Sequence, residues 1–110
     1  MAVEVLESDS SPSRLMLICE HATNHVPPDI TVPEADRDKL EIHWGWDPGA
    51  ERLVRRLSAL EGAPAVLSRF SRLLCDPNRA LDQENLIRTH ALGEPLQLNT
   101  ALSDAEIDRR

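Results

Sequence analysis

Apolar positions along the chain form two short continuous runs with a helical stripe between them. Residues 15–19 and 65–67 are unbroken apolar runs of strand length, a pattern typical of strands buried on both faces. Between these runs, Asp47 and Pro48 predict the start of a helix and Gly62 predicts its end. The apolar stripe of this helix comprises Ala50, Leu53, Val54, Leu57 and Leu60. The order strand, loop, helix, strand predicts an α/β fold.

Shorter elements are expected on either side of this unit. Residues 33–46 are compatible with a short helix that has an acidic first turn. Residues 71–79 resemble a short apolar strand that ends in a polar turn. We expect residues 1–13, which mix acids with Ser and Pro, to be a flexible N-terminus, so that the ordered domain occupies residues 14–110.

The last residues indicate that a helix begins close to the end of the chain. Ser103 and Glu106 have the spacing of a capping box, but only four residues follow Glu106. Isolated helices shorter than about 12 residues are marginal in water. We therefore expect residues 14–110 to be the N-terminal half of a longer domain, or a naturally truncated copy of one.

Composition and charge exclude several classes of protein. The 110 residues include 19 acidic and 12 basic side chains, a formal charge of −7, which argues against nucleic acid as a partner. The longest apolar run is far shorter than the roughly 20 residues of a membrane span, and the acidic N-terminus is unlike a signal peptide. Cys19 and Cys75 have neither a zinc-ribbon nor a redox spacing. We expect a cytoplasmic protein with reduced thiols and no contact with membranes.

One stretch of the sequence gathers residues that suit a metal. His21, His25 and His43 fall within 23 residues, with Glu20 directly before this stretch and Asp47 four residues after it. Neutral imidazole and carboxylate are zinc ligands, although this spacing matches no strong local signature. The alternatives are ordinary surface histidines, a solvated Glu20, and an Asp47 that only caps the helix after it.

A second stretch suits an anionic ligand. Arg72 and Arg79 supply two guanidinium groups, and Asn78 adds a carboxamide, next to a tight turn. Arginine can bind a carboxylate with two parallel hydrogen bonds, so a substrate carboxylate is one partner for this segment. The alternative is that Asp76 and Arg79 pair with each other. Two further residues, Trp44 and Trp46, could line a pocket or fill the core.

Three segments, in this order, resemble the N-formylglutamate amidohydrolase family. They are Cys-Glu-His-Ala-Thr-Asn-His-Val-Pro at 19–27, His-Trp-Gly-Trp-Asp-Pro-Gly-Ala at 43–50, and Ser-Arg-Leu-Leu-Cys-Asp-Pro-Asn-Arg at 71–79. The resemblance covers residues 15–110 and looks like the N-terminal half of the family's domain. It implies an α/β fold with a mixed sheet and helices on both faces, similar to the zinc carboxypeptidase and aspartoacylase type (phosphorylase/hydrolase-like).

The resemblance also implies roles for individual residues. His21 and Asp47 match metal-ligand positions, with zinc or another divalent ion as the cofactor. The related enzymes have Glu three residues after the first histidine, whereas this chain has Asn24, a poor zinc ligand. The general base is expected beyond Arg110, with Glu20 as a weaker candidate. The residues expected to bind the substrate's carboxylate are Arg72, Asn78 and Arg79.

The activity implied by the resemblance is metal-dependent amide hydrolysis. The substrate would be a small N-acyl amino acid such as N-formyl-L-glutamate, and the products would be formate, or another acyl group, and the free amino acid. The alternative is a truncated, non-catalytic remnant that binds a carboxylate ligand or a partner protein. A truncated chain would leave a strand edge and an apolar face uncovered, so self-association is a further expectation.

Overall fold

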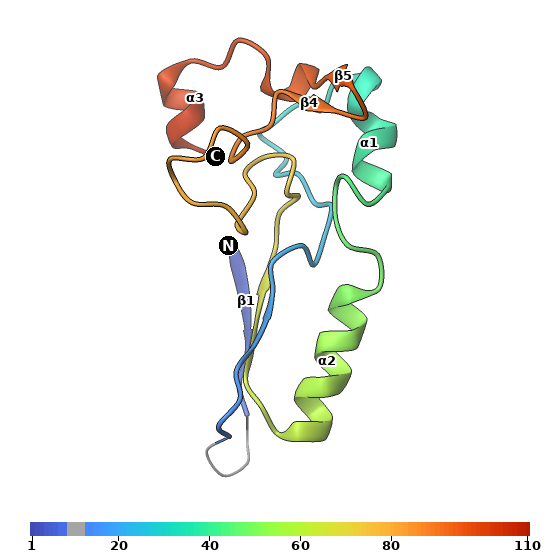
Figure 1. Ribbon diagram of the computed structural model, residues 1–110, viewed down its shortest axis with the longest axis vertical. Helices are drawn as coiled ribbons and strands as arrows, with labels where there is room; N and C mark the ends of the chain where they lie inside the picture. The colour runs from blue at the N-terminus through green and yellow to red at the C-terminus, as the bar shows by residue number, and fades with distance from the viewer. Residues whose placement is uncertain (9–12) are drawn as a thin grey trace.

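A computed structural model describes residues 1–8 and 13–110 and shows an elongated α/β molecule of 49 × 26 × 25 Å (Figure 1). Its main sheet contains β1 (Val3–Leu6), β2 (Leu17–Cys19) and β3 (Ala65–Ser68), in the order β1-β3-β2. β2 runs parallel to β3, and β1 runs antiparallel to it. The expected mixed sheet is therefore confirmed.

The helix α2 (Ala50–Glu61) connects β2 to β3 and covers one face of the sheet. It begins after Gly49 and ends at Gly62, and both glycines have the left-handed φ that other residues rarely adopt (89° and 58°). Ala50 and Val54 pack against a buried cluster on the sheet. That cluster consists of Cys19, Ala22, Ala65 and Leu67.

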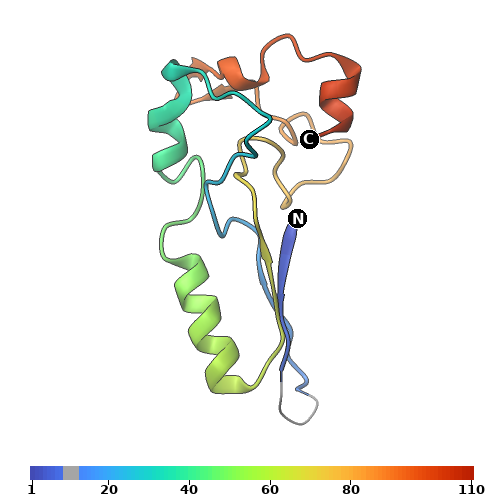
Figure 2. The same ribbon diagram turned by 180° about the vertical axis from the view of Figure 1, so that it is seen from behind.

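The expectation of helices on both faces of the sheet is not met by the residues that the structure describes. On the face opposite α2, the side chains of Val3, Val5 and Ile18 are 41–59% exposed. Figure 2 shows the sheet from behind, with α2 again on one side only. On α2 itself, Leu53 and Leu60 are 60% and 76% exposed. The sheet therefore covers Ala50 and Val54 of the apolar stripe on α2 but leaves Leu53 and Leu60 exposed.

The N-terminal residues also differ from the expectation. Residues 1–13 were expected to be flexible, but Val3–Leu6 form β1, which pairs with all four residues of β3. This strand also carries Glu4, which accepts a hydrogen bond from Arg55 of α2 over 2.7 Å. The prediction was wrong because strand pairing and this ion pair are long-range contacts. Within the same range, residues 9–12 lie outside the described part of the chain.

The other half of the molecule is built from short elements around a second apolar cluster. The elements are η1 (Glu34–Asp36), α1 (Arg37–Glu41), β4 (His90–Ala91), β5 (Glu94–Pro95), η2 (Gln97–Asn99) and α3 (Asp104–Asp108). The cluster consists of Leu40, Leu73, Leu74, Ala91, Leu96 and Leu98. The short helix predicted within 33–46 corresponds to η1 and α1, and the Ser103–Glu106 capping box is present on α3.

Residues 71–79 form turns instead of the predicted strand. Leu73 and Leu74 are buried, as an apolar run suggests, but they enter the second cluster. The turn forms because Leu74 N–H donates to Ser71 O over 3.0 Å, while the Ser71 hydroxyl donates to Gly45 O over 2.8 Å.

Among the described residues, no helix has the length and apolar character needed to cross a bilayer.

Candidate functional site

His21 follows β2 directly, and the backbone on each side of it is held by β3. Ser68, the last residue of β3, donates its hydroxyl to Glu20 O over 2.5 Å and accepts a hydrogen bond from Ala22 N–H over 3.3 Å. His21 O in turn accepts from Asp47 N–H over 2.9 Å. The His21 side chain is 7% exposed. These contacts place its imidazole at the carboxyl end of the parallel strands, where open α/β sheets bind their ligands.

Asp47 faces His21 and does not cap α2. Its Oδ2 lies 3.3 Å from His21 Nδ1. The N-cap of α2 is Gly49, and no side chain bonds to the cap. The capping alternative from the sequence is therefore wrong. The positive φ of Gly49 turns the chain between Asp47 and the helix, so the carboxylate is directed at the loop after β2.

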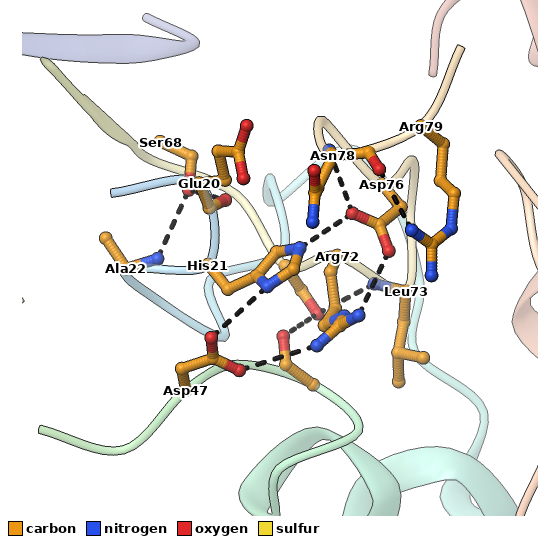
Figure 3. Close-up of polar contacts among 12 residues, drawn as sticks. Glu20, His21, Ala22, Asp47, Ser68, Arg72, Leu73, Asp76, Asn78 and Arg79 are labelled. Carbon is orange, nitrogen blue, oxygen red and sulfur yellow. Dashed lines mark hydrogen bonds and ion pairs between the residues drawn. The ribbon is translucent and has the colours of Figure 1, made fainter. Parts of the chain in front are cut away.

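Asp76 is completely buried on the other side of His21 (Figure 3). Its Oδ1 accepts a hydrogen bond from His21 Nε2–H over 2.7 Å and another from Asn78 N–H over 3.0 Å. Burial by itself raises the pKa of the Asp76 carboxyl. The contacts with His21, the Asn78 amide and Arg72 together outweigh that effect and hold the pKa below its usual value.

Arg72 lies between the two carboxylates. Its Nη1 donates to Asp47 Oδ1 over 3.4 Å, and its Nη2 donates to Asp76 Oδ2 over 3.1 Å. The arginine side chain is 18% exposed. Each carboxylate thus has one oxygen next to His21 and the other next to Arg72, which produces a closed ring of four side chains (Figure 3).

Asn78 and Arg79 follow Asp76 in the same turn, on the outer side of the ring. The Arg79 backbone N–H donates to Asp76 O over 3.1 Å, and its Nη1 donates to Asn78 O over 3.0 Å. No ion pair joins the side chains of Asp76 and Arg79 in the described structure, because Asp76 pairs with His21 and Arg72. Arg79 Nε is buried without a hydrogen-bond partner among the described residues. The Arg79 guanidinium therefore has a donor without a protein partner in the described structure.

The remaining sequence candidates lie apart from this ring. His25 and His43 are exposed, and His43 contacts the ring of Trp44. Glu20 lies directly before His21, but its carboxylate is on the side of His21 away from Asp47. Within residues 1–8 and 13–110, no three His, Cys, Asp or Glu side chains form a group that could hold a metal ion. Of these five candidate ligands, only His21 and Asp47 therefore belong to the ring.

The two tryptophans and two cysteines have other surroundings. Trp44 packs against the second apolar cluster and lies beneath the guanidinium of Arg88, 5.1 Å from the ring centre. Trp46 lies beside α2 and borders an open surface hollow. Both thiols are free, as expected, and burial raises the pKa of Cys19 and Cys75. These residues do not contribute to the ring.

The sequence interpretation missed Asp76 and Ser68. Asp76 was weighed only as a partner for Arg79, although it follows the apolar pair Leu73–Leu74 and lies four residues after Arg72. A carboxylate directly after a buried run is itself a signal, because it must find partners once it is buried. Ser68 gave no comparable signal, since nothing local shows that its hydroxyl meets the loop after β2.

Comparisons with known proteins found a family and a similar solved structure. The sequence model of N-formylglutamate amidohydrolase matches residues 13–110. Among solved structures, the chain is similar to the gene product Atu2144 from Agrobacterium tumefaciens, with a TM-score of 0.87 and 31% sequence identity. That match covers 97% of this chain and 42% of the Agrobacterium chain, so this chain spans less than half of its length. No curated protein matches. Because the family match covers most of the residues, the chain belongs to the N-formylglutamate amidohydrolase family.

Proposed function

We propose that this chain carries the metal-binding and substrate-binding part of a hydrolase that splits the amide bond of an N-acyl amino acid. The substrate class that fits best is an N-formyl amino acid such as N-formyl-L-glutamate, and the products would be formate and the free amino acid. The observation that carries the proposal is the placement of His21 between Asp47 and Asp76. Family membership supplies the class of reaction.

The donor atoms of this site fit a divalent metal. In a tetrahedral zinc site with ligands at about 2.0–2.2 Å, neighbouring ligand atoms lie about 3.3–3.6 Å apart. His21 Nδ1 and Asp47 Oδ2 are 3.3 Å apart. His21 Nε2 lies 2.7 Å from the buried carboxylate of Asp76, and donation of an Nε2 proton to that carboxylate would leave Nδ1 to bind the metal. His21 and Asp47 would therefore be two protein ligands of zinc or another divalent ion.

When bound, such an ion lowers the pKa of a coordinated water toward about 7 and polarises the acyl carbonyl. The residues of this chain would have three tasks in the reaction. His21 and Asp47 hold the ion, Asp76 fixes the orientation of the imidazole, and Asn78 and Arg79 bind the carboxylate of the amino acid. The overall reaction adds one water across the C–N bond, which leaves a carboxylic acid and an amine.

Arg79 is well suited to the substrate's carboxylate because its guanidinium is not engaged by a protein carboxylate in the described structure. Asn78 is exposed beside it and can donate through its carboxamide. Holding the carboxylate would fix the position of the scissile carbonyl relative to His21 and Asp47, a positioning effect that can lower a barrier by several kcal/mol. Arg72 was expected to share this task, but its terminal nitrogens contact Asp47 and Asp76.

The experiment that tests the proposal measures formate released from N-formyl-L-glutamate by the purified protein loaded with zinc. Chelation is expected to remove the activity, and added zinc is expected to restore it. The variant H21A is expected to lose both zinc binding and activity, whereas H43A, which changes an exposed histidine outside the ring, should retain both. An H21A protein that still retains one equivalent of zinc would contradict the assignment.

A second function remains open because the chain spans 42% of its structural neighbour. A protein that uses Asn78 and Arg79 to bind a carboxylate ligand without hydrolysing it would show saturable binding of N-formyl-L-glutamate and no formate. The same assay, combined with calorimetry, therefore distinguishes a hydrolase from a binding protein.

A further inference from the structure

The ring of His21, Asp47, Arg72 and Asp76 indicates a role for Arg72 in metal binding. This inference rests on the proposed function and goes beyond it. We propose that Arg72 is a positioning residue: it fixes Asp47 and Asp76 against the two ring nitrogens of His21 and so sets the affinity of the site for a divalent metal. In this role Arg72 contacts neither the metal nor the substrate, and it acts through the two carboxylates.

The guanidinium of Arg72 is placed to hold both carboxylates at once. Its two terminal nitrogens contact different partners, with Nη1 next to Asp47 and Nη2 next to Asp76. The arginine is also anchored at its backbone, where Arg72 N–H donates to Gly45 O over 3.3 Å. Arginine has a rigid, planar fork of donors, whereas lysine has a single point charge on a flexible stem. The arrangement therefore depends on the shape of the side chain as well as its charge.

Asp47 is the residue that most needs this support. Its side chain is 51% exposed and lies in a loop just before the helix. In the described structure, the contacts of its carboxylate are with His21 and Arg72 alone. An exposed carboxylate without a second partner would have several rotamers to lose when a metal binds. Arg72 removes this freedom in advance, because it holds Oδ1 while Oδ2 faces Nδ1.

Asp76, the other carboxylate that Arg72 contacts, is held more firmly than Asp47. It is fully buried and receives hydrogen bonds from His21, Arg72 and the Asn78 amide. Arg72 thus connects the exposed carboxylate of Asp47 to a buried carboxylate with three hydrogen-bond donors. Two carboxylates and one guanidinium carry a net charge of −1 next to the imidazole, which still favours a cation.

The test compares R72K with R56K, a matched control in which the arginine is exposed on α2. Zinc binding to each purified protein is measured by calorimetry. Outer contacts that orient metal ligands typically change metal affinity by about 10–100-fold, so R72K is expected to raise the zinc Kd by at least about tenfold. R56K should leave the Kd unchanged. If R72K binds zinc as tightly as the wild type, charge alone suffices and the proposal is overturned.

A second readout needs no metal. In the metal-free protein, the nitrogen chemical shifts of the His21 imidazole report which ring nitrogen carries the proton. The wild type is expected to show one fixed tautomer with Nε2 protonated, and R72K is expected to shift the Nδ1 resonance. Unchanged His21 resonances in R72K would overturn the positioning role. If R72K does not fold, R72Q, which can reach one carboxylate but not both, should show the same shift and the same loss of affinity.

This design separates failure of the inference from failure of the proposed function. If the wild type binds no divalent metal, the proposed hydrolase mechanism fails, and the His21 resonances alone decide whether Arg72 positions the ring.

In the variant D47N, Arg72 has lost one of its carboxylates, so adding R72K should weaken zinc binding less than it does in the wild type. An equal loss in both backgrounds would show that Arg72 does not act through Asp47, which also overturns the proposal.

Discussion

Asp76 and His21 are 55 positions apart in the sequence, yet the Asp76 carboxylate accepts a 2.7 Å hydrogen bond from the His21 imidazole. Both side chains are buried, and Asp76 has no exposed surface at all. A hydrogen bond of this kind determines which ring nitrogen of His21 carries the proton. In the proposed metal site it would also determine which nitrogen binds the metal, and the nitrogen away from Asp76, Nδ1, faces Asp47.

Replacing Asp76 with Asn should weaken both the fold and the site. Asn keeps the shape of the side chain but removes the charge that Arg72 and His21 contact. We expect the free energy of unfolding to fall by about 1.5–3 kcal/mol, the range for a hydrogen bond to a charged group. We also expect zinc affinity to fall by about 10–100-fold. Urea denaturation and calorimetric titration measure the two effects, with D82N, an exposed loop variant, as the control.

Replacing Arg79 with Ala should mainly affect substrate binding in the active hydrolase. The lost interaction is a hydrogen bond between charged groups, so kcat/KM for N-formyl-L-glutamate should fall by about 10–100-fold, through a higher KM. Zinc affinity should not change, because Arg79 does not contact the ring side chains. Steady-state kinetics and zinc titration check both statements. An unchanged KM would remove Arg79 from the binding site.

Replacing Gly45 with Ala should disrupt the scaffold beneath Arg72. A Cβ at this position would lie 2.3 Å from Leu40 O and 2.7 Å from Leu40 Cα, and backbone atoms of α1 cannot move aside easily. Gly45 O also accepts the Ser71 and Arg72 hydrogen bonds. We expect G45A to lower the thermal midpoint by several degrees more than G93A. At Gly93 a Cβ meets nothing within 4 Å, and only its φ of +75° opposes the change.

Glu4 should make the attachment of β1 sensitive to acid. The hydrogen bond from Arg55 lowers the pKa of the Glu4 carboxyl below its ordinary 4.5. The stabilisation is therefore present at neutral pH and is lost as the pH falls through the lowered pKa. In E4Q the urea midpoint should depend less on pH between 3 and 5 than in the wild type. Equal pH dependence of the two proteins would show that Glu4 does not contribute.

Local patterns predicted the elements whose contacts lie close in the sequence. Strands within the two apolar runs, the helix stop at Gly62 and the capping box of Ser103 and Glu106 are all present. Burial of the first run on both faces was wrong, because β2 is limited to Leu17–Cys19 and Ile18 is 59% exposed. The errors occur where a distant partner decides the outcome. Val3–Leu6 form a strand because β3 pairs with them, and the strand predicted near Leu73 becomes a turn because Ser71 bonds to Gly45.

For the candidate site, the sequence by itself indicated the family and part of the residue set. The residues that it indicated are His21, Asp47, Asn78 and Arg79, which suit the proposed hydrolase and fall in segments that resemble the family. Only the tertiary structure decided which residues meet. It excluded His25 and His43 from the ring, added Asp76 and gave Arg72 two protein partners. The physical reason is that the loop after β2, the loop before α2 and the turn after β3 converge at one end of the sheet. Contacts across such separations follow from strand pairing and burial, which local spacing does not encode.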